Sequence, residues 1–577
     1  MNRRNILKTF ILSLFPVLAF AACMKMKGAA HKDIKADFEY REIYLPEGSG
    51  EYGLSLDLND VNNDWGIWGH NIRLVIPDNH SENIYAKKNG VTIHDQYSFM
   101  SNHLFDYYAD YIDSKYDETD SLKFAIVPND NDIVCLCAKC VDAGNTQKDA
   151  SPAVLNMAKR LAERFPNHQF FTSYYRTTSS IPKEKLPKNI GVLVSAMEYP
   201  LSNAPSGEED KFVSLLNQWS QVSDHVYVWD YINNFDDYFT PYPIFDIMQR
   251  RLKLYRDNGV KGIFLNGSGT NYSAFSNIHT DVLAALTVNP DTDWKKVLRE
   301  SALKHFPTAG NIIADFMIQQ EDYAKSTNAQ LPLYEGIKAE LKTYLPENEF
   351  IDFHNKLISL KNQASGDELR ELEKLCGALA MTCLEIDRLR GDLSSAPEMI
   401  ALLSALPGMD INSYNESNWT VEHYLRDYNR LLEDHNATAS TNLLKGMQIT
   451  SHSTLDPDYK DLSILTDGVL GIPSNYHSGN MLYSGEGPLK LEIPRVGGMK
   501  KIRVGFVYNP PYKIVIPIDV SLYIGGRLVK NIEPGVPDDH SGHLFVEFDV
   551  PADGNIMLMV TRDPDVRSIA IDEIQAF

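Results

Sequence analysis

The sequence predicts a multidomain protein: an α/β barrel of the TIM type, complete or incomplete, then a helical bundle, then a C-terminal β-sandwich of the jelly-roll type. Apolar strands alternate with amphipathic helices over residues 33–285, helical periodicity dominates residues 286–440, and short alternating runs separated by turn residues fill residues 445–577. A chain of 577 residues is too long for one domain, and its 43% of hydrophobic residues can form several cores.

The barrel prediction depends on six apolar runs, each followed by a helical or polar stretch. A closed barrel of this type needs eight strands. The region is therefore an incomplete barrel, a barrel that borrows irregular strands from residues 70–95, or an open sheet. The predicted strands are Phe38–Tyr44, Lys123–Val127, Gln169–Ser173, Ile190–Ala196, His225–Trp229 and Gly262–Leu265. The predicted helices between them are Met100–Lys115, Ala153–Phe165, Lys211–Ser223 and Pro243–Asn258.

The two later regions have different periodicities. Apolar residues recur every three to four positions in the middle of the chain, which predicts helices at Trp294–His305, Asn311–Lys325, Leu333–Thr343 and Glu368–Leu389. Short alternating runs between glycine- and proline-containing turns then predict strands at Leu489–Ile493, Lys501–Val507, Ile514–Ile524, His543–Val550 and Ile556–Thr561.

The first 23 residues have the pattern of an export signal. Three basic residues precede an apolar run that ends in two alanines and Cys23. Small residues before a cysteine are typical of bacterial lipoproteins, in which that cysteine carries the lipid. Ordinary signal cleavage and a permanent anchor are the alternatives, although the run is short for a membrane span. We expect residues 1–23 to be a lipoprotein signal peptide. The exported protein would then be held at the periplasmic face or the cell surface through Cys23.

Composition limits the partners and cofactors. The formal net charge of −22 argues against a nucleic-acid partner and against any membrane contact other than the lipid. No phosphate-binding or dinucleotide-binding fingerprint occurs, so we expect no cofactor. The spacing Cys135-x-Cys137-x-x-Cys140 resembles half a zinc site, but a structural zinc needs four ligands. We therefore expect a local disulfide or simple packing there, and no metal.

Polar and aromatic residues gather where the predicted strands end, which is where barrel enzymes carry their sites. Aromatic faces cover the C–H face of a sugar ring, and glycosidases need two carboxyl groups. Glu198 and Asp230 follow successive strands and are the predicted catalytic pair, with Asp130 as a third candidate. The predicted substrate-binding residues are Trp68, His70, Asp130, Tyr174, Trp229, Tyr231, Asn233 and Asn266.

Each of these residues also has a purely structural interpretation. An acid at a strand end often caps a helix or braces a loop, and Asp130 lies in an Asn-Asp-Asn-Asp run that is ordinary turn chemistry. His70 could brace its loop, and Trp68 and Trp229 could be core residues. The sequence leaves both interpretations open.

Several motifs in order resemble an uncharacterised bacterial family, the domain of unknown function 4838. They are Trp68–Asn71, Asp130-Asn131 before the cysteine cluster, Val226–Phe235, Pro241–Pro243 and Asn258–Gly262. The family resembles α-glucuronidase and β-hexosaminidase barrels, which implies polysaccharide breakdown. Its members usually carry a further domain before the barrel. Many have an acid near the position of Asn266, so the resemblance also raises the alternative of a degenerate barrel.

The C-terminal region resembles the discoidin, or F5/8 type C, family at Leu465–Gly468 and Ile569–Ile574. Such domains often bind sugars through loops at one end. The motif residues do not identify the binding residues, and Tyr476, His477 and Tyr508 are candidate loop contacts. The leading hypothesis is an exported glycoside hydrolase with an appended carbohydrate-binding module. The alternatives are a non-catalytic glycan-binding lipoprotein with a degenerate barrel and an adhesion protein.

Overall fold

The computed structural model describes residues 36–577, except for 205–206, 329, 538–541, 552 and 565–567. The predicted signal peptide and Cys23 lie outside the described residues. Within the described part of the chain, every helix is too short or too polar to cross a membrane.

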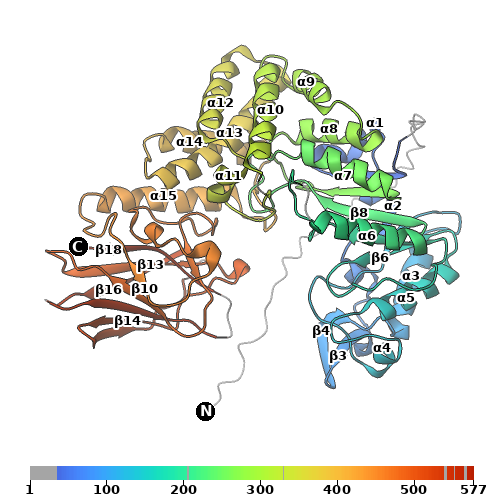
Figure 1. Cartoon of the computed structure of the whole chain (residues 1–577), viewed down its shortest axis with the longest axis horizontal. Coiled ribbons are helices and arrows are strands. Elements are labelled where there is room, and N and C mark those ends of the chain that lie inside the picture. Colours follow the sequence, from blue (N-terminus) through green and yellow to red (C-terminus); the bar gives the residue numbers. More distant parts are fainter. Residues whose placement is uncertain (1–35, 205–206, 329, 538–541, 552, 565–567) are drawn as a thin grey trace. The chain divides into compact units, whose positions relative to one another are not determined.

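A seven-stranded parallel sheet organises the first region (Figure 1). Its order is β1-β9-β8-β7-β6-β5-β2, so neighbours in the sequence are mostly neighbours in the sheet. The six predicted strands are confirmed. The seventh, β2, has only three residues, which is too short to produce a periodic pattern. The strands are β1 Tyr40–Tyr44, β2 Trp65–Ile67, β5 Lys123–Ala125, β6 Gln169–Tyr174, β7 Ile190–Ser195, β8 His225–Tyr231 and β9 Gly262–Asn266.

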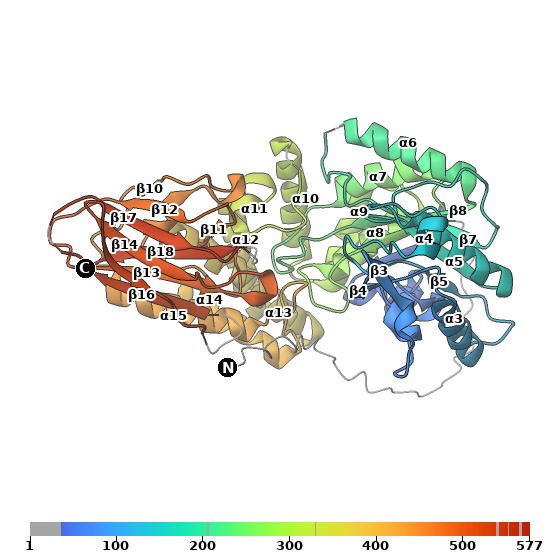
Figure 2. The same ribbon diagram turned by 90° about the horizontal axis from the view of Figure 1, so that it is seen from below.

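Helices connect successive strands and pack on one face of the sheet (Figures 1 and 2). The four predicted connecting helices are confirmed, with ends shifted by up to four residues. The helices of this region are α1 Gly50–Ser55, α2 Val61–Asp64, α3 Asn102–Lys115, α4 Ala138–Asp142, α5 Ser151–Arg164, α6 Gly207–Val222, α7 Phe245–Asp257 and α8 Ser276–Val288.

Single hydrogen bonds and ring contacts, rather than a backbone ladder, join the two edge strands of the curled sheet. Trp65 of β2 donates its indole N–H to the Tyr40 hydroxyl of β1 at 2.9 Å, and their ring centroids are 6.1 Å apart. The backbone N–H of Asn59, just before α2, donates to the backbone carbonyl of Arg41 in β1 at 2.8 Å. Residues 70–95 do not complete the barrel, because β3 (Tyr85–Lys88) and β4 (Val91–Tyr97) pair only with each other.

Each strand contributes an inward side chain to one aromatic-rich core. These residues are Tyr40, Trp65, Ala125, Phe171, Leu193, Tyr227 and Phe264. Glycines on the intervening strands make room for the rings: Gly191 lies against the Phe171 ring and Gly262 against the Tyr227 ring.

We expect Gly262→Ala to lower the free energy of unfolding by about 1–3 kcal/mol, because overpacking a filled core forces neighbours to move. A Cβ at this position would lie 2.5 Å from the Tyr227 ring. Urea denaturation measures the change. Gly408→Ala is the control, since a Cβ there has no neighbour within 4 Å. An unchanged midpoint for Gly262→Ala would contradict the packing described here.

The middle region is helical, as predicted. The four predicted helices are confirmed, and three further helices were not predicted. Cys376 and Cys383 are both buried within the longest helix, α13. The helices are α9 Trp294–His305, α10 Gly310–Thr327, α11 Ile337–Thr343, α12 Glu347–Leu360, α13 Gly366–Arg390, α14 Ala396–Leu403 and α15 Val421–Thr438.

Two antiparallel sheets form the C-terminal region and share one apolar core. One sheet has the order β10-β12-β17-β14-β15 and the other β11-β18-β13-β16. The predicted fold class, an α/β barrel-like sheet, a helical region and a β-sandwich, is confirmed. The strands are β10 Thr450–Ser451, β11 Met481–Tyr483, β12 Leu489–Ile493, β13 Lys501–Tyr508, β14 Asp519–Ile524, β15 Arg527–Ile532, β16 Gly542–Asp549, β17 Ile556–Thr561 and β18 Ile569–Ala576.

Candidate active site

A pocket of about 180 Å³ lies at the carboxyl ends of the parallel strands. The strand ends and their loops supply one wall, and two loops of the helical region supply the other. The polar and aromatic lining residues are His70, Asp130, Ser173, Tyr175, Ser195, Trp229, Tyr231, Asn266, Tyr334 and Glu416.

Stacked aromatic rings support one side of the pocket. Trp229, at the end of β8, lines the pocket and stacks on Trp68, with centroids 4.9 Å apart and planes 12° apart. Phe264 of β9 packs against both rings at 4.4–4.6 Å. Since three rings hold one another in place, Trp229 presents a fixed apolar surface, which is what the C–H face of a sugar ring requires.

Two carboxylates line the pocket from opposite walls. Glu416 accepts a hydrogen bond from the Tyr334 hydroxyl at 3.0 Å. Glu416 is an exposed residue, but the protein around its carboxyl group displaces enough water to raise its pKa. The negative charges of Asp236 and Asp130 add to this effect, while the Tyr334 bond opposes it. Glu416 therefore keeps its proton to a higher pH than an ordinary glutamate.

Asp130 is paired with a cation. Arg176, in the loop after β6, donates to Asp130 at 2.7 Å and makes two bonds of 3.1 Å to Asp132. About half of the Asp130 side chain is exposed. One carboxyl group with a raised pKa and a second that is ion-paired is the asymmetry that acid–base catalysis uses.

His70 lies beside these groups on the loop after β2. Its Nδ1 is 2.5 Å from the Pro128 carbonyl oxygen. A carbonyl only accepts hydrogen bonds, so Nδ1 donates and Nε2 of the neutral ring is the acceptor. His70 thus braces the loop that carries Asp130 and also lines the pocket, so the structural and functional interpretations both apply to it.

Residues 27–318, about half of the chain, match the sequence profile of a family described as a domain of unknown function, DUF4838. The chain belongs to the DUF4838 family. No curated protein matches the DUF4838 chain in sequence.

Three solved structures illustrate what the DUF4838 chain is similar to. A family GH115 4-O-methyl-α-glucuronidase with specificity for decorated arabinogalactans is 12% identical over 86% of this chain and 68% of its own, with a TM-score of 0.35. A GH138 enzyme targeting pectin rhamnogalacturonan II is 9% identical over 82% and 77%, with a TM-score of 0.27. A Streptococcus pneumoniae fucose binding module is 14% identical over 24% and 97%, with a TM-score of 0.19.

Five predicted site residues of the DUF4838 chain come together in the pocket: His70, Asp130, Trp229, Tyr231 and Asn266. Trp68 lies behind Trp229 as its stacking partner. Asn233 is buried but is not part of the pocket lining.

The structure places Tyr174 outside the pocket, one position away from residues that line it. Its ring packs edge-on against Trp219 of α6, with centroids 6.2 Å apart, on the helix-covered face of the sheet. Ser173 and Tyr175, its neighbours on either side, line the pocket instead. Successive strand residues point to opposite faces, so an error of one position selects the wrong face.

The structure brings neither Glu198 nor Asp230 into the pocket lining. Asp230 alternates with Trp229 and Tyr231 and therefore points away from the pocket. It is fully buried and accepts hydrogen bonds from Arg251 and Tyr255 of α7, both at 2.6 Å. Glu198 lies exposed in the turn after β7, outside the pocket lining.

Tyr334 and Glu416 were missed from the sequence because they belong to the helical region. Backbone hydrogen bonds bring them to the barrel: Glu416 donates to the Phe235 carbonyl at 2.8 Å, and Phe235 donates to the Leu333 carbonyl at 2.7 Å. The sequence feature that could have indicated Glu416 is a run of aromatic and polar residues at 412–419, between α14 and α15.

Two of the loop residues expected as sugar contacts, Tyr476 and His477, also have a structural role. His477 Nε2 lies 2.7 Å from an Asp236 carboxylate oxygen, and the Tyr476 hydroxyl donates to the same oxygen at 3.2 Å. Asp236 belongs to the loop after β8. Tyr476 and His477 therefore hold a barrel loop in place.

Proposed function

We propose that this protein hydrolyses glycosidic bonds in a polysaccharide or glycan. The observation that carries the proposal is the pairing of Glu416 and Asp130 in one aromatic-sided pocket, with the pKa of Glu416 raised. A glycosidase requires a protonated carboxyl group and a second, ionised one around the scissile bond. This pair replaces Glu198 and Asp230, the pair expected from the sequence.

In the proposed reaction, the Glu416 carboxyl group protonates the leaving-group oxygen as its bond to the anomeric carbon breaks. Asp130 either attacks that carbon or removes a proton from the water that attacks it, depending on the separation of the two carboxyl groups. Trp229 covers the C–H face of the sugar, and Tyr175, His70 and Asn266 bind hydroxyl groups.

A non-catalytic glycan-binding protein is the second candidate. The observations that favour it are the ion pair that already engages Asp130 and the amide of Asn266 at a strand end. An amide binds sugar hydroxyl groups but cannot act as an acid or a base. This function uses the same pocket and differs only in that no bond is cleaved.

Release of reducing sugar from a broad panel of plant and host glycans tests the two functions. Wild-type protein that releases sugar from at least one glycan supports the hydrolase. Saturable binding without release, measured calorimetrically on the same panel, supports the binding protein. If the protein neither releases sugar from any glycan nor binds one, the proposal that it acts on a glycan is wrong.

The C-terminal sandwich is proposed to bind glycan as well. A second cavity of about 300 Å³ lies there, lined by Tyr459, Tyr476 and Tyr512 among others, and the last two rings lie 4.4 Å apart. Tyrosines with polar neighbours are the residue types that sugar-binding modules use. Loss of glycan binding in Tyr512→Ala with hydrolysis of a soluble substrate retained would support this role.

We also propose that the protein is exported and anchored through a lipid on Cys23, since the residues before it match a lipoprotein signal. Mass spectrometry of the N-terminal peptide from membranes tests this. A lipid-modified Cys23 supports the anchor, and an N-terminus at any other residue contradicts it.

The activity should fall as the pH rises through the pKa of Glu416, because the acid acts in its protonated form. Tyr334→Phe removes the hydrogen bond that favours the Glu416 carboxylate, so the pKa should rise further and the basic limb of the kcat/KM profile should move to higher pH. The control is Tyr323→Phe, which removes a tyrosine hydroxyl that donates to the Leu341 carbonyl. A limb that stays in place or moves to lower pH would exclude Glu416 as the acid.

A further inference from the structure

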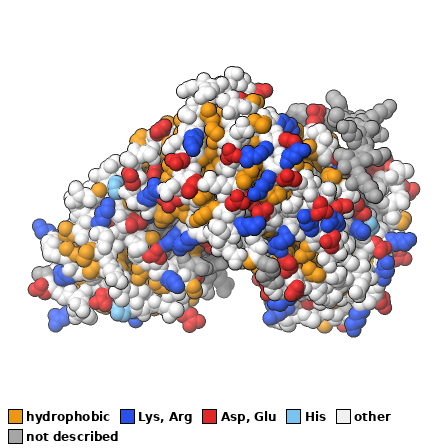
Figure 3. Space-filling model, turned by 45° about the horizontal axis from the view of Figure 1, so that its top comes forward, with side chains coloured by type: hydrophobic (Ala, Val, Ile, Leu, Met, Phe, Trp, Pro, Cys, Tyr) orange, Lys and Arg blue, Asp and Glu red, His pale blue; other side chains and the backbone are white. Residues whose placement is uncertain are grey.

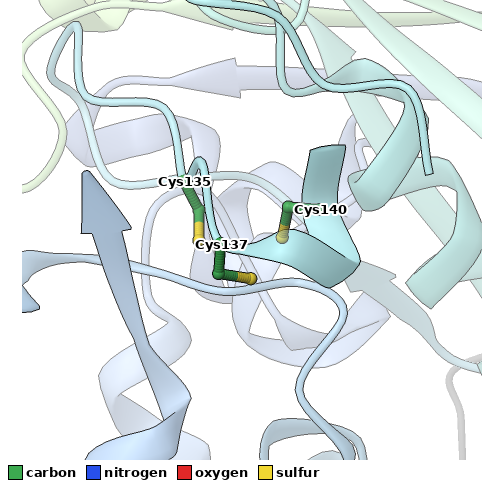
Figure 4. Close-up of side chains that lie close together, drawn as sticks. All are labelled: Cys135, Cys137 and Cys140. Atoms are coloured by element: carbon green, nitrogen blue, oxygen red, sulfur yellow. The ribbon is translucent and has the colours of Figure 1, made fainter. Parts of the chain in front are cut away.

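Three cysteines converge where the chain enters α4 (Figure 4). Cys135 and Cys137 lie in the segment before α4, and Cys140 lies within that helix. Their sulfur atoms are all within 4.8 Å of one another. All three are free thiols, so of the two alternatives expected from the sequence, a local disulfide or simple packing, the disulfide is not formed.

The surroundings of the sulfur atoms suit thiolates. Cys135 and Cys140 are buried, and Cys137 is partly buried. The backbone N–H of Lys87 donates to Cys135 Sγ at 3.3 Å. The Ser98 hydroxyl lies 3.4 Å from Cys140 Sγ and 3.5 Å from Cys137 Sγ. Hydrogen-bond donors directed at sulfur orient and tune metal-bound thiolates.

A disulfide accounts for this cluster poorly. A disulfide would use two of the three sulfur atoms and leave the third beside it as a free thiol. The other two described cysteines are buried in α13, far along the chain, and do not belong to the cluster. Three convergent sulfur atoms match the ligand number and chemistry of a soft metal ion instead.

We propose that Cys135, Cys137 and Cys140 bind a zinc ion. Zinc takes thiolate ligands in four-coordinate sites, and binding releases the three thiol protons. Cys137 and Ser98 line a surface pocket, so a fourth ligand can come from water.

The ion would stabilise the segment 135–140, which is hydrogen-bonded to the β3–β4 hairpin. The amide of Leu136, between two of the cysteines, donates to the Lys87 carbonyl of β3 at 2.7 Å. Gln96 of β4 donates to the Asn129 carbonyl at 3.1 Å and to the Asn131 side chain at 3.0 Å. The same loop carries Asp130 into the active site. Zinc would therefore stabilise the segment that contacts the β3–β4 hairpin, which in turn supports the Asp130 loop.

Metal analysis of the full chain, purified without chelator, tests the inference and does not depend on hydrolase activity. We expect one zinc ion per chain by mass spectrometry of the digested protein. Cys137→Ser should lose the zinc, and Cys376→Ala, which changes a cysteine outside the cluster, should keep it. A different metal, or none, in the wild-type protein would overturn the proposal.

Alkylation of the wild-type protein gives a readout that does not depend on whether a variant folds. The three clustered thiols should resist iodoacetamide in the native protein and react after a chelator removes the zinc, with a fall in Tm. Peptide masses that show a disulfide between any two of the three cysteines would exclude the zinc site. Thiols that react equally with and without the chelator would exclude it too.

Discussion

Replacing Glu416 with glutamine is expected to lower kcat on any glycan that the protein cleaves by about 10²–10⁴-fold, the usual contribution of a general acid. The glutamine amide keeps the size of the side chain and its hydrogen bond with Tyr334, but it has no acidic proton that could be transferred to the leaving group. Stability should change little, because part of the side chain is exposed. Steady-state kinetics and circular dichroism measure the two effects.

The leaving group distinguishes Glu416 from Asp130. An aryl glycoside with an acidic phenol leaves without protonation, so the defect of Glu416→Gln should shrink on such a substrate. The defect of Asp130→Asn should persist, because its role at the anomeric carbon or the water remains. Glu198→Gln is the matched control and should retain wild-type rates, since Glu198 lies outside the pocket lining. Wild-type rates in Glu416→Gln would refute the assignment.

Replacing Asp230 with alanine should lower the free energy of unfolding by about 3–5 kcal/mol, because it leaves the buried Arg251 charge without its partner. Both side chains have 0% exposure. Arg251 also donates to the Tyr199 and Pro200 carbonyls, so the pair links β8, α7 and the loop after β7. Urea denaturation monitored by tryptophan fluorescence measures the loss.

Two comparisons separate this structural role from a catalytic one. Asp224→Ala breaks an exposed ion pair with Lys185 and should cost only about 0–1 kcal/mol. Adding Arg251→Met to Asp230→Ala should recover part of the stability, because an uncharged pair of similar volume leaves no buried charge. If the Asp230→Ala protein had wild-type stability but no activity, Asp230 would have a catalytic role rather than a structural one.

The strand-and-helix rhythm was readable because most of the parallel strands contain a short run of apolar residues and the connecting helices have one apolar face. Side-chain direction was not readable to the single residue. The shift from Tyr174 to Tyr175 and the outward direction of Asp230 both follow from the point at which a strand begins. Because side chains alternate with a period of two, placing the start of a strand one residue too early or too late assigns its side chains to the opposite face of the sheet.

The second carboxyl group of the site could not be found by reading strand ends. Glu416 follows the last strand of the parallel sheet by about 150 residues and reaches the pocket through one backbone hydrogen bond to Phe235. Contacts of such long sequence separation leave no local pattern in one sequence. Trp229, His70 and Asp130 were found because barrel topology itself places strand ends in one ring.

The bonds from Tyr476 and His477 to Asp236 bear on how this architecture can be inherited. Appended binding modules are ordinarily exchanged between genes because few contacts cross the linker. Here the sandwich supplies hydrogen bonds to a loop that also holds the backbone of Glu416. Recombination that replaced the sandwich would change the support of that loop, so the barrel and the sandwich are expected to have diverged together as one evolutionary unit.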